Sequence, residues 1–160
     1  MSAVKRFVAA LMVGLMAAAL LPVTSASAAC YSPNRKEKKF ARKMNGARDN
    51  AGKSSLRLDP ELSKAAKVHT REMVNKDLLH HTPSDTLRRR VTNWTILGEN
   101  VGVGGTVGSL HTAFMNSTAH RANILLSDFR HVGVGVKKAD GRLWVTVIFE
   151  ARSDPGSPLC

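Results

Sequence analysis

Two side chains stand out as residues that could do chemistry, a glutamate and a histidine. Glu99 lies in the apolar, glycine-flanked run of residues 97–102, and His120 follows an amphipathic segment. A carboxylate that is buried among apolar residues carries a large desolvation cost unless a partner compensates for it. A histidine or a cation would be such a partner. The pair therefore indicates either a hydrogen-bonded cluster or a metal site.

The other five histidines differ in what their positions predict. His69 lies on the apolar face of a helical pattern, which is typical of a hydrogen-bonded core histidine, and His111 lies at the buried edge of its own helix. His131 begins a strand and is expected to be exposed. His80 and His81 form a loop pair, of which one can turn inward while the other faces water. Spacing alone singles out none of them as a ligand.

Other motifs lack the pattern that their chemistry requires. The glycines of residues 102–108 do not have the spacing of a dinucleotide-binding loop and predict a flexible loop. Ser117 and His120 lack the third orienting group and the oxyanion donor that a serine hydrolase needs. The chain has no Cys-x-x-Cys motif, so disulfide redox catalysis is not expected.

Residues 1–29 have the pattern of a secretory signal peptide. Two basic residues precede an apolar stretch over residues 7–21, and small residues fill positions 24–29. The apolar stretch is shorter than the roughly 20 residues that a membrane-spanning helix needs. We expect cleavage after Ala28 or Ala29, and hence a secreted, extracellular protein that is not transmembrane.

The two cysteines, Cys30 and Cys160, are the first and last residues of the expected mature chain. In an oxidising compartment such a pair is expected to form a disulfide, which would stabilise the fold by about 4–5 kcal/mol by closing a long loop. Acylation of Cys30 as a lipoprotein anchor is the alternative. Lipoprotein signals normally have leucine or a similar residue where this chain has Ser27.

The mature domain, residues 30–160, is strongly basic. The chain has a formal net charge of +12, of which the signal segment contributes only two charges. Basic residues cluster at positions 35–39 and 88–90, which predicts either a solvated surface or attraction to a lipid headgroup or anionic cell-envelope material. Nucleic acid is not expected as a partner, because the chain is exported and has few aromatic residues for stacking. We expect a monomer.

Helical patterns dominate the first part of the mature domain. Gly52 ends the first of them. Asp59 and Pro60 are typical of an N-cap and a first helical residue, and they open the second. Apolar spacing predicts four helical segments in all, over residues 40–51, 60–73, 107–117 and 120–126.

The last part of the domain changes to the alternation of strands. Residues 131–138 and 143–150 alternate between two faces, and Asp140-Gly141 between them predicts a hairpin turn. Residues 97–103 offer a third strand. The glycines that alternate with valines in the first strand of the hairpin indicate that another layer approaches closely. Helices before a small antiparallel sheet predict an α+β domain.

Several short motifs occur in an order that resembles the CAP superfamily, which comprises cysteine-rich secretory proteins, antigen 5 and pathogenesis-related 1 proteins. They are Met44, Asn45, Arg48, residues 62–73, His81, Thr82, and residues 98–100, 114–117, 120–125 and 132–136. The resemblance covers nearly all of residues 37–150 and is to the short bacterial secreted branch. It implies a single α-β-α sandwich with a small antiparallel sheet flanked by helices.

The resemblance also implies a surface cleft whose two histidines and acidic groups bind a divalent cation in some members. The matching residues are His81, Glu99 and His120, with His80 as the alternative to His81. Such a set can hold zinc or another divalent cation, with water in the open position. The alternative is a hydrogen-bonded His–Glu–His cluster that only ties the loops together.

The chain departs from the family pattern on the third predicted helix. Eukaryotic relatives have a tryptophan there and a second glutamate three residues later, where this chain has Phe114 and Ser117. A site with one carboxylate is a poorer metal site than one with four ligands.

Family members differ widely in function, so the resemblance implies only a general role. We expect a secreted, non-catalytic binding domain for a lipid, a cell-envelope component or another extracellular ligand. The alternative is a divalent-metal-dependent, peptidase-like hydrolase, with His81 and His120 as ligands and Glu99 as ligand or general base. In both cases the three side chains should converge in one cleft.

Overall fold

The computed structural model describes residues 32–152. The expected signal peptide and the predicted Cys30–Cys160 pair lie outside the described residues. The elements are α1 (Arg35–Asn50), β1 (Arg57–Leu58), α2 (Pro60–Lys76), α3 (Ser84–Arg90), β2 (Ile96–Gly104), α4 (Val107–Asn116), α5 (Thr118–Leu125), β3 (His131–Ala139) and β4 (Arg142–Ala151).

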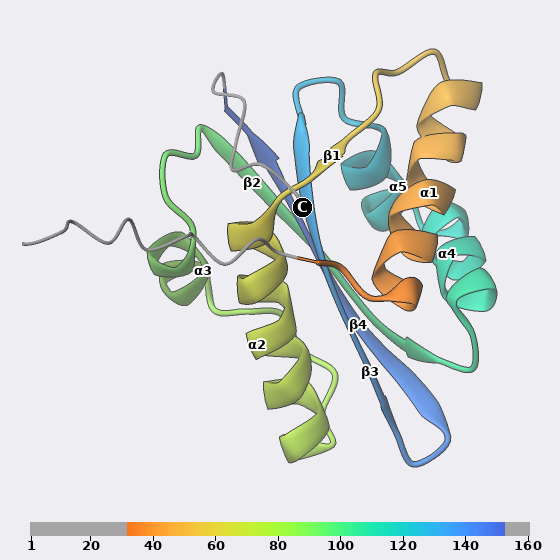
Figure 1. The fold of residues 1–160 in the computed structure, drawn as a ribbon, viewed down its shortest axis with the longest axis vertical. Helices are drawn as coiled ribbons and strands as arrows, with labels where there is room; N and C mark the ends of the chain where they lie inside the picture. Colours follow the sequence, from red (N-terminus) through yellow and green to blue (C-terminus); the bar gives the residue numbers. More distant parts are fainter. Residues whose placement is uncertain (1–31, 153–160) are drawn as a thin grey trace, which may run out of the picture.

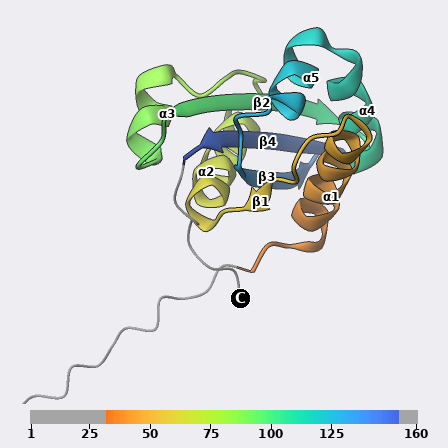
Figure 2. The same cartoon turned by 90° about the horizontal axis from the view of Figure 1, so that it is seen from above.

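The elements form three layers with the sheet in the middle, which confirms the expected α+β sandwich. The four strands have the order β1-β3-β4-β2. α2 and α3 cover one face of the sheet, and α1, α4 and α5 cover the other (Figures 1 and 2). The sheet is mixed rather than purely antiparallel, because the two residues of β1 pair in parallel with the start of β3.

The predicted hairpin is confirmed as β3 and β4, which pair in an antiparallel register from His131↔Glu150 to Ala139↔Arg142. Asp140 and Gly141 between them have φ angles of 47° and 74°. Two successive residues with positive φ are typical of the tight turns that match the twist of a hairpin. The local sequence alone was therefore sufficient to place this turn.

α2 packs directly on two glycines of β3. A Cβ atom at Gly133 would lie 2.1 Å from the carbonyl carbon of Leu62, and one at Gly135 would lie 2.5 Å from that of Ala66. No side chain fits in this space, so the helix backbone touches the sheet. The close approach that the alternating glycines indicated is confirmed.

Helix ends follow the local sequence where a side chain caps them. The Asp59 carboxylate accepts a hydrogen bond from the Leu62 amide at 3.0 Å, with Pro60 as the first residue of α2, as predicted. α3 was not predicted. It has seven residues, one buried side chain and no side-chain cap, so neither apolar spacing nor capping marks it in the sequence.

Arg48 of α1 is fully buried and ties three parts of the chain together. Its guanidinium donates hydrogen bonds to the carbonyls of Ser54, Ile124, Leu126 and Phe129. Burial, and to a smaller extent the charge of Arg130, lowers the pKa of Arg48. The end of α1 is thereby fixed to α5 and to the loop that precedes β3.

The expectation that His131 is exposed was wrong, since only 3% of the residue is accessible. β3 is an inner strand, and His131 pairs with Arg57 on one side and Glu150 on the other. Its Nδ1 atom lies 3.9 Å from the Glu150 carboxylate. Within residues 32–152, no helix is long and apolar enough to cross a membrane.

Candidate functional site

The carboxylate of Glu99 accepts three hydrogen bonds from the loop that precedes α3. Its Oε1 atom lies 2.8 Å from Nδ1 of His81 and 2.9 Å from the amide nitrogen of Thr82. Its Oε2 atom accepts the Thr82 hydroxyl at 2.6 Å. The side chain of Glu99 is 5% exposed, whereas that of His81 is 59% exposed. The desolvation of this carboxylate is thus offset by donors from a single loop.

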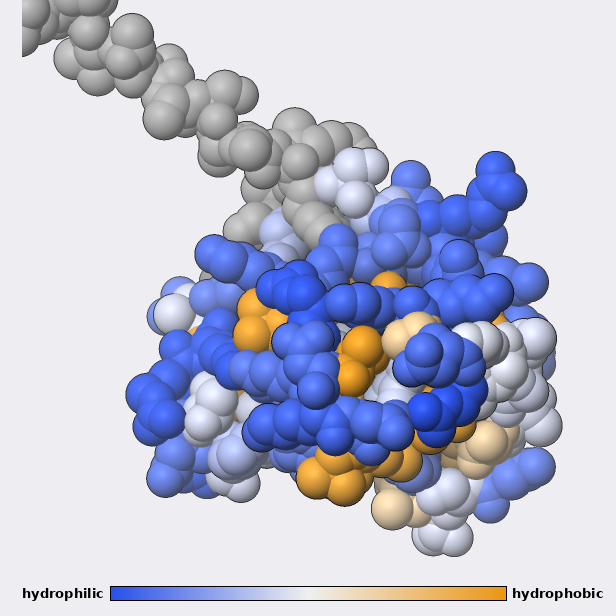
Figure 3. All heavy atoms as spheres, turned by 90° about the horizontal axis from the view of Figure 1, so that it is seen from below, coloured by the Kyte–Doolittle hydropathy of each residue, from blue (hydrophilic) through white to orange (hydrophobic). Residues whose placement is uncertain are grey.

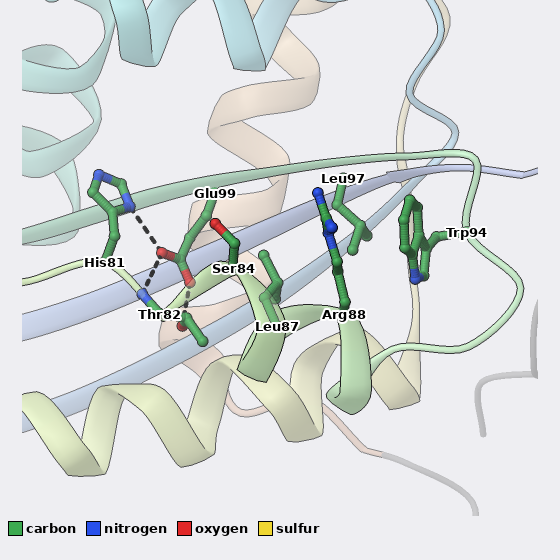
Figure 4. Close-up of a pocket in the computed structure, with 8 residues that line it drawn as sticks. All are labelled: His81, Thr82, Ser84, Leu87, Arg88, Trp94, Leu97 and Glu99. Carbon is green, nitrogen blue, oxygen red and sulfur yellow. Dashed lines mark hydrogen bonds and ion pairs between the residues drawn. The ribbon is translucent and has the colours of Figure 1, made fainter.

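The hydrogen bond from His81 also sets which ring nitrogen faces outward. A carboxylate can only accept, so Nδ1 of His81 donates, and in the neutral ring the lone pair lies on Nε2. Figure 4 shows this second nitrogen directed away from Glu99. An imidazole held by a carboxylate at one nitrogen is a common arrangement of metal-binding histidines.

His120 lies within electrostatic reach of His81. Burial, and then the charge of His81, lowers the pKa of His120 below the ordinary value of 6.5, which favours the neutral ring. The ring packs on Phe114, with 4.8 Å between ring centroids. Phe114 therefore supports the histidine by contact from the neighbouring helix.

Two asparagines fix the helix that carries His120. The Asn100 amide donates to the carbonyl of His120 at 2.9 Å. Asn123 of the same helix donates to the Asn100 side chain at 2.9 Å and to the carbonyl of Glu99 at 3.2 Å. These bonds hold α5 against β2 at the position of Glu99.

The location of β2 at the sheet edge explains how residues from both faces can meet. Glu99 and Asn100 are consecutive in a strand, so their side chains point to opposite faces. Glu99 is opposite Ile148, which packs with α2, while Asn100 is opposite Val147, in the core under α1 and α4. The loop of His81 and the helix of His120 therefore approach each other around the open side of β2.

His80 does not take part in this arrangement. Its Nδ1 atom lies 3.0 Å from the carbonyl of Leu78, and its ring lies against the ring of His69. His69 is fully buried, and its Nε2 atom lies 2.7 Å from the carbonyl of His80, so the prediction of a hydrogen-bonded core histidine is confirmed. The geometry thus pairs Glu99 with His81 rather than with the alternative His80.

A pocket of about 300 Å³ adjoins the His81–Glu99 pair (Figure 4). One wall is polar, with His81 and Ser84. Arg88 of α3 and Trp94 of the following loop form the far end, where the guanidinium lies 5.8 Å from the indole ring. The sequence pattern did not predict the roles of Arg88 and Trp94. Arg88 belongs to the basic cluster of residues 88–90. Trp94, the aromatic residue that faces it, was the one signal that could have distinguished Arg88 from the other two arginines.

Thr82 and the apolar side chains of Leu87 and Leu97 complete the lining of the pocket. The profile of the Cysteine-rich secretory protein family (CAP) matches residues 41–149, which include both sides of the cleft. The chain belongs to the CAP family.

The sequence of this CAP domain is similar to that of a bacterial protein. The protein YkwD of Bacillus subtilis (strain 168) is 33% identical over 115 residues, which are 68% of this chain and 44% of YkwD. The chain thus spans less than half the length of that relative.

Solved structures agree on the fold. An outer surface protein of Borrelia burgdorferi is 18% identical, with a TM-score of 0.69 over 78% of this chain and 98% of the Borrelia protein. An extracellular protein of Bacillus anthracis that contains an SCP domain is 23% identical, with a TM-score of 0.65 over 74% of this chain and 40% of that protein.

The described part of this CAP domain has no closed set of metal ligands. Within the described part of the chain, no group of three or more His, Cys, Asp or Glu side chains is arranged to hold a metal ion. Both oxygens of Glu99 already accept hydrogen bonds. Glu99 therefore fits the role of a residue that orients His81.

Proposed function

We propose that this CAP domain is a secreted, non-catalytic binding domain whose ligand enters the cleft beside His81. The observation that carries the proposal is the set of three hydrogen bonds on Glu99. Both carboxylate oxygens are occupied by donors from the loop of His81 and Thr82, and Nε2 of His81 remains available to a ligand. A pocket lined by Ser84 and Arg88 together with apolar side chains is typical of small-ligand sites, where a few polar groups orient the ligand.

A divalent cation such as zinc would be held by His81 and His120. Both rings are suited to this, because His81 presents Nε2 and the lowered pKa of His120 favours the neutral ring, which has a nitrogen lone pair to offer. The cation would supply a positive charge that attracts an acidic ligand. Two protein ligands give weak affinity, so oxygen from the ligand would strengthen the complex.

The pocket favours a cell-envelope ligand that has both an acidic group and an apolar face. Arg88 can bind a carboxylate or a phosphate, since its guanidinium offers a fork of donors. Trp94 and Leu97 offer surface to a sugar ring or an aliphatic chain.

The hydrolase alternative receives less support from the same geometry. A general base must accept a proton from water, but Glu99 is 5% exposed and its oxygens are occupied by His81 and Thr82. We therefore assign Glu99 a positioning role.

Titration with Zn²⁺, followed by calorimetry and by the NMR signals of the histidine rings, tests the cleft. We expect one ion to bind with His81 and His120 shifting together, and binding to be lost in His81→Ala and His120→Ala. His80→Ala is the matched control, because it removes the adjacent ring without touching Glu99. Equal Zn²⁺ binding by the His81→Ala/His120→Ala double variant, or none by the unsubstituted protein, would overturn the cation site.

A second measurement separates binding from catalysis. The protein, loaded with Zn²⁺, is incubated with a mixed peptide library and with cell-envelope extract, and products are followed by mass spectrometry. We expect retention of an envelope component without turnover. Zn²⁺-dependent cleavage that is lost in His120→Ala would instead establish the hydrolase.

A further inference from the structure

The first helix carries a dense run of basic side chains, and pockets lie on both sides of it. The start of α1, the start of α4 and the β3–β4 hairpin enclose a cavity of about 410 Å³. Arg35, Lys36 and Lys39 of α1 line it together with Lys138 of β3. These elements lie at the same end of the molecule (Figure 1), and hydrophilic residues cover most of that face in Figure 3. Four cations thus surround one hollow.

A second pocket, of about 290 Å³, lies on the other flank of the same helix. Lys38 and Arg42 of α1 line it, opposite Leu56 and Leu58. Neither pocket has an acidic residue among its described lining residues. Glu37, the acidic residue within this basic run, is fully buried and lies 3.3 Å from Lys67, so it does not neutralise the exposed cations.

This distribution of charge favours a long anion over a small one. The six cations, five on α1 and one on β3, repel one another and attract counterions. A polyanion releases these counterions when it binds. A single headgroup could occupy only one pocket. A flexible chain with repeating charges that crosses α1 would reach both pockets at once.

The pocket linings also distinguish among polyanionic partners. The large apolar side chains that are exposed in the described structure are Leu78, Leu79, Ile96 and Leu126, and none of them lines either pocket. A membrane surface would therefore gain no inserted side chain here. No Phe, Tyr or Trp among the described residues lines the pockets either, so nucleic acid bases would find no stacking platform.

We infer that α1 binds an extracellular phosphodiester polymer without bases, such as a polyol-phosphate chain of a cell wall. Phosphates sit in the two pockets, and the polyol segment between them crosses the helix. The site shares no residue with the cleft at His81, so it is independent of the function proposed for that cleft.

Binding of poly(glycerol phosphate), followed by calorimetry, tests this site. The variant Lys36→Glu/Lys39→Glu reverses two charges of the larger pocket. The control Lys64→Glu/Arg71→Glu reverses two exposed charges on α2 and gives the same net charge. Acidic residues near the start of α1 also favour its dipole, so the first variant should remain folded.

We expect binding to weaken about tenfold or more in the α1 variant, and about twofold or less in the α2 control. Raising the salt concentration from about 50 to about 200 mM should weaken binding by a factor of about ten or more. Equal weakening in both variants would overturn the site, because only net charge would then matter.

Two further probes test the alternative partners. Single-stranded DNA of equal charge that binds tenfold more tightly than the polymer would identify a nucleic-acid surface. Binding to phosphatidylglycerol vesicles without binding to the polymer would identify a membrane surface. Either result, or the absence of polymer binding, contradicts the inference.

Discussion

Nδ1 of His81 lies 2.8 Å from Oε1 of Glu99, and this bond joins an exposed loop to the edge strand of the sheet. The carboxylate is buried while the ring is largely exposed. An exposed ring has many rotamers, and this single contact selects one of them. The geometry of the cleft therefore depends on the charge of a side chain that solvent scarcely reaches.

Replacing Glu99 by glutamine should test this dependence. An amide has one accepting oxygen, so Glu99→Gln leaves at least one donor of His81 or Thr82 without its partner. We expect the free energy of unfolding to fall by about 1–3 kcal/mol in urea denaturation. The ¹⁵N signals of His81 should change at the same time. Asp85→Asn removes an exposed carboxylate of α3 and is the control. Unchanged His81 signals would exclude the positioning role.

Gly135→Ala should destabilise the protein because α2 has no room to accept a methyl group. The added Cβ would lie 2.5 Å from backbone atoms of Ala66. We expect a loss of about 1–3 kcal/mol or more, measured by thermal or urea unfolding. Gly46→Ala on α1 is the matched control, since its Cβ would meet nothing within 4 Å and should stabilise the helix by about 0.5–1 kcal/mol. Similar effects of the two substitutions would mean that the α2 contact is looser than the geometry indicates.

Arg48→Met should cost more than most surface substitutions. Methionine fills much of the volume but removes the guanidinium donor from four carbonyls, of which that of Phe129 keeps a second donor from Arg130. We expect the free energy of unfolding to fall by at least about 3 kcal/mol. Arg42→Met, an exposed change on the same helix, should alter it by less than about 0.5 kcal/mol. Equal midpoints for the two variants in urea would contradict the structural role of Arg48.

His111 should make stability depend on pH in mildly acidic solution. Burial, and then the charge of Lys43, lowers its pKa below the ordinary value of 6.5, while a backbone hydrogen bond acts in the opposite direction. The unfolded chain therefore binds a proton at a higher pH than the folded chain. The stabilising contribution is fully present above about pH 6.5 and is lost as the pH falls through the lowered pKa.

The variant His111→Gln isolates this contribution. Above about pH 6.5, the free energies of unfolding of the two proteins should differ by a constant amount. At lower pH, the unsubstituted protein should lose stability relative to the variant. His120 titrates in both proteins, so its own lowered pKa cancels in the difference. Parallel stability curves from about pH 7 to about pH 4 would show that the His111 ring is not desolvated.

Local signals in the sequence were enough to predict much of the fold. The β3–β4 turn, the Asp59 cap and the close contact at the glycines of β3 each depend on a few adjacent residues. β1 and the burial of His131 could not be predicted in this way. Both depend on which strand lies beside β3, and that is decided by long-range packing.

The same distinction between local signals and long-range packing applies to the candidate site. The family resemblance predicted His81, Glu99 and His120 as site residues, and the structure pairs His81 with Glu99. It did not predict that both oxygens of Glu99 are occupied, because two of the donors belong to Thr82 and depend on the path of the loop. The pairing of Arg88 with Trp94 also depends on α3, which has no strong signal in the sequence.

The amide of Asn123 has a consequence for the behaviour of the protein in concentrated solution. An edge strand offers free backbone groups on which a strand of another molecule can add. Asn123 donates to the carbonyl of Glu99, so α5 occupies one of the groups that an added strand of a second molecule would need. A second molecule that added a strand at this point of β2 would first have to displace the bond between α5 and Glu99.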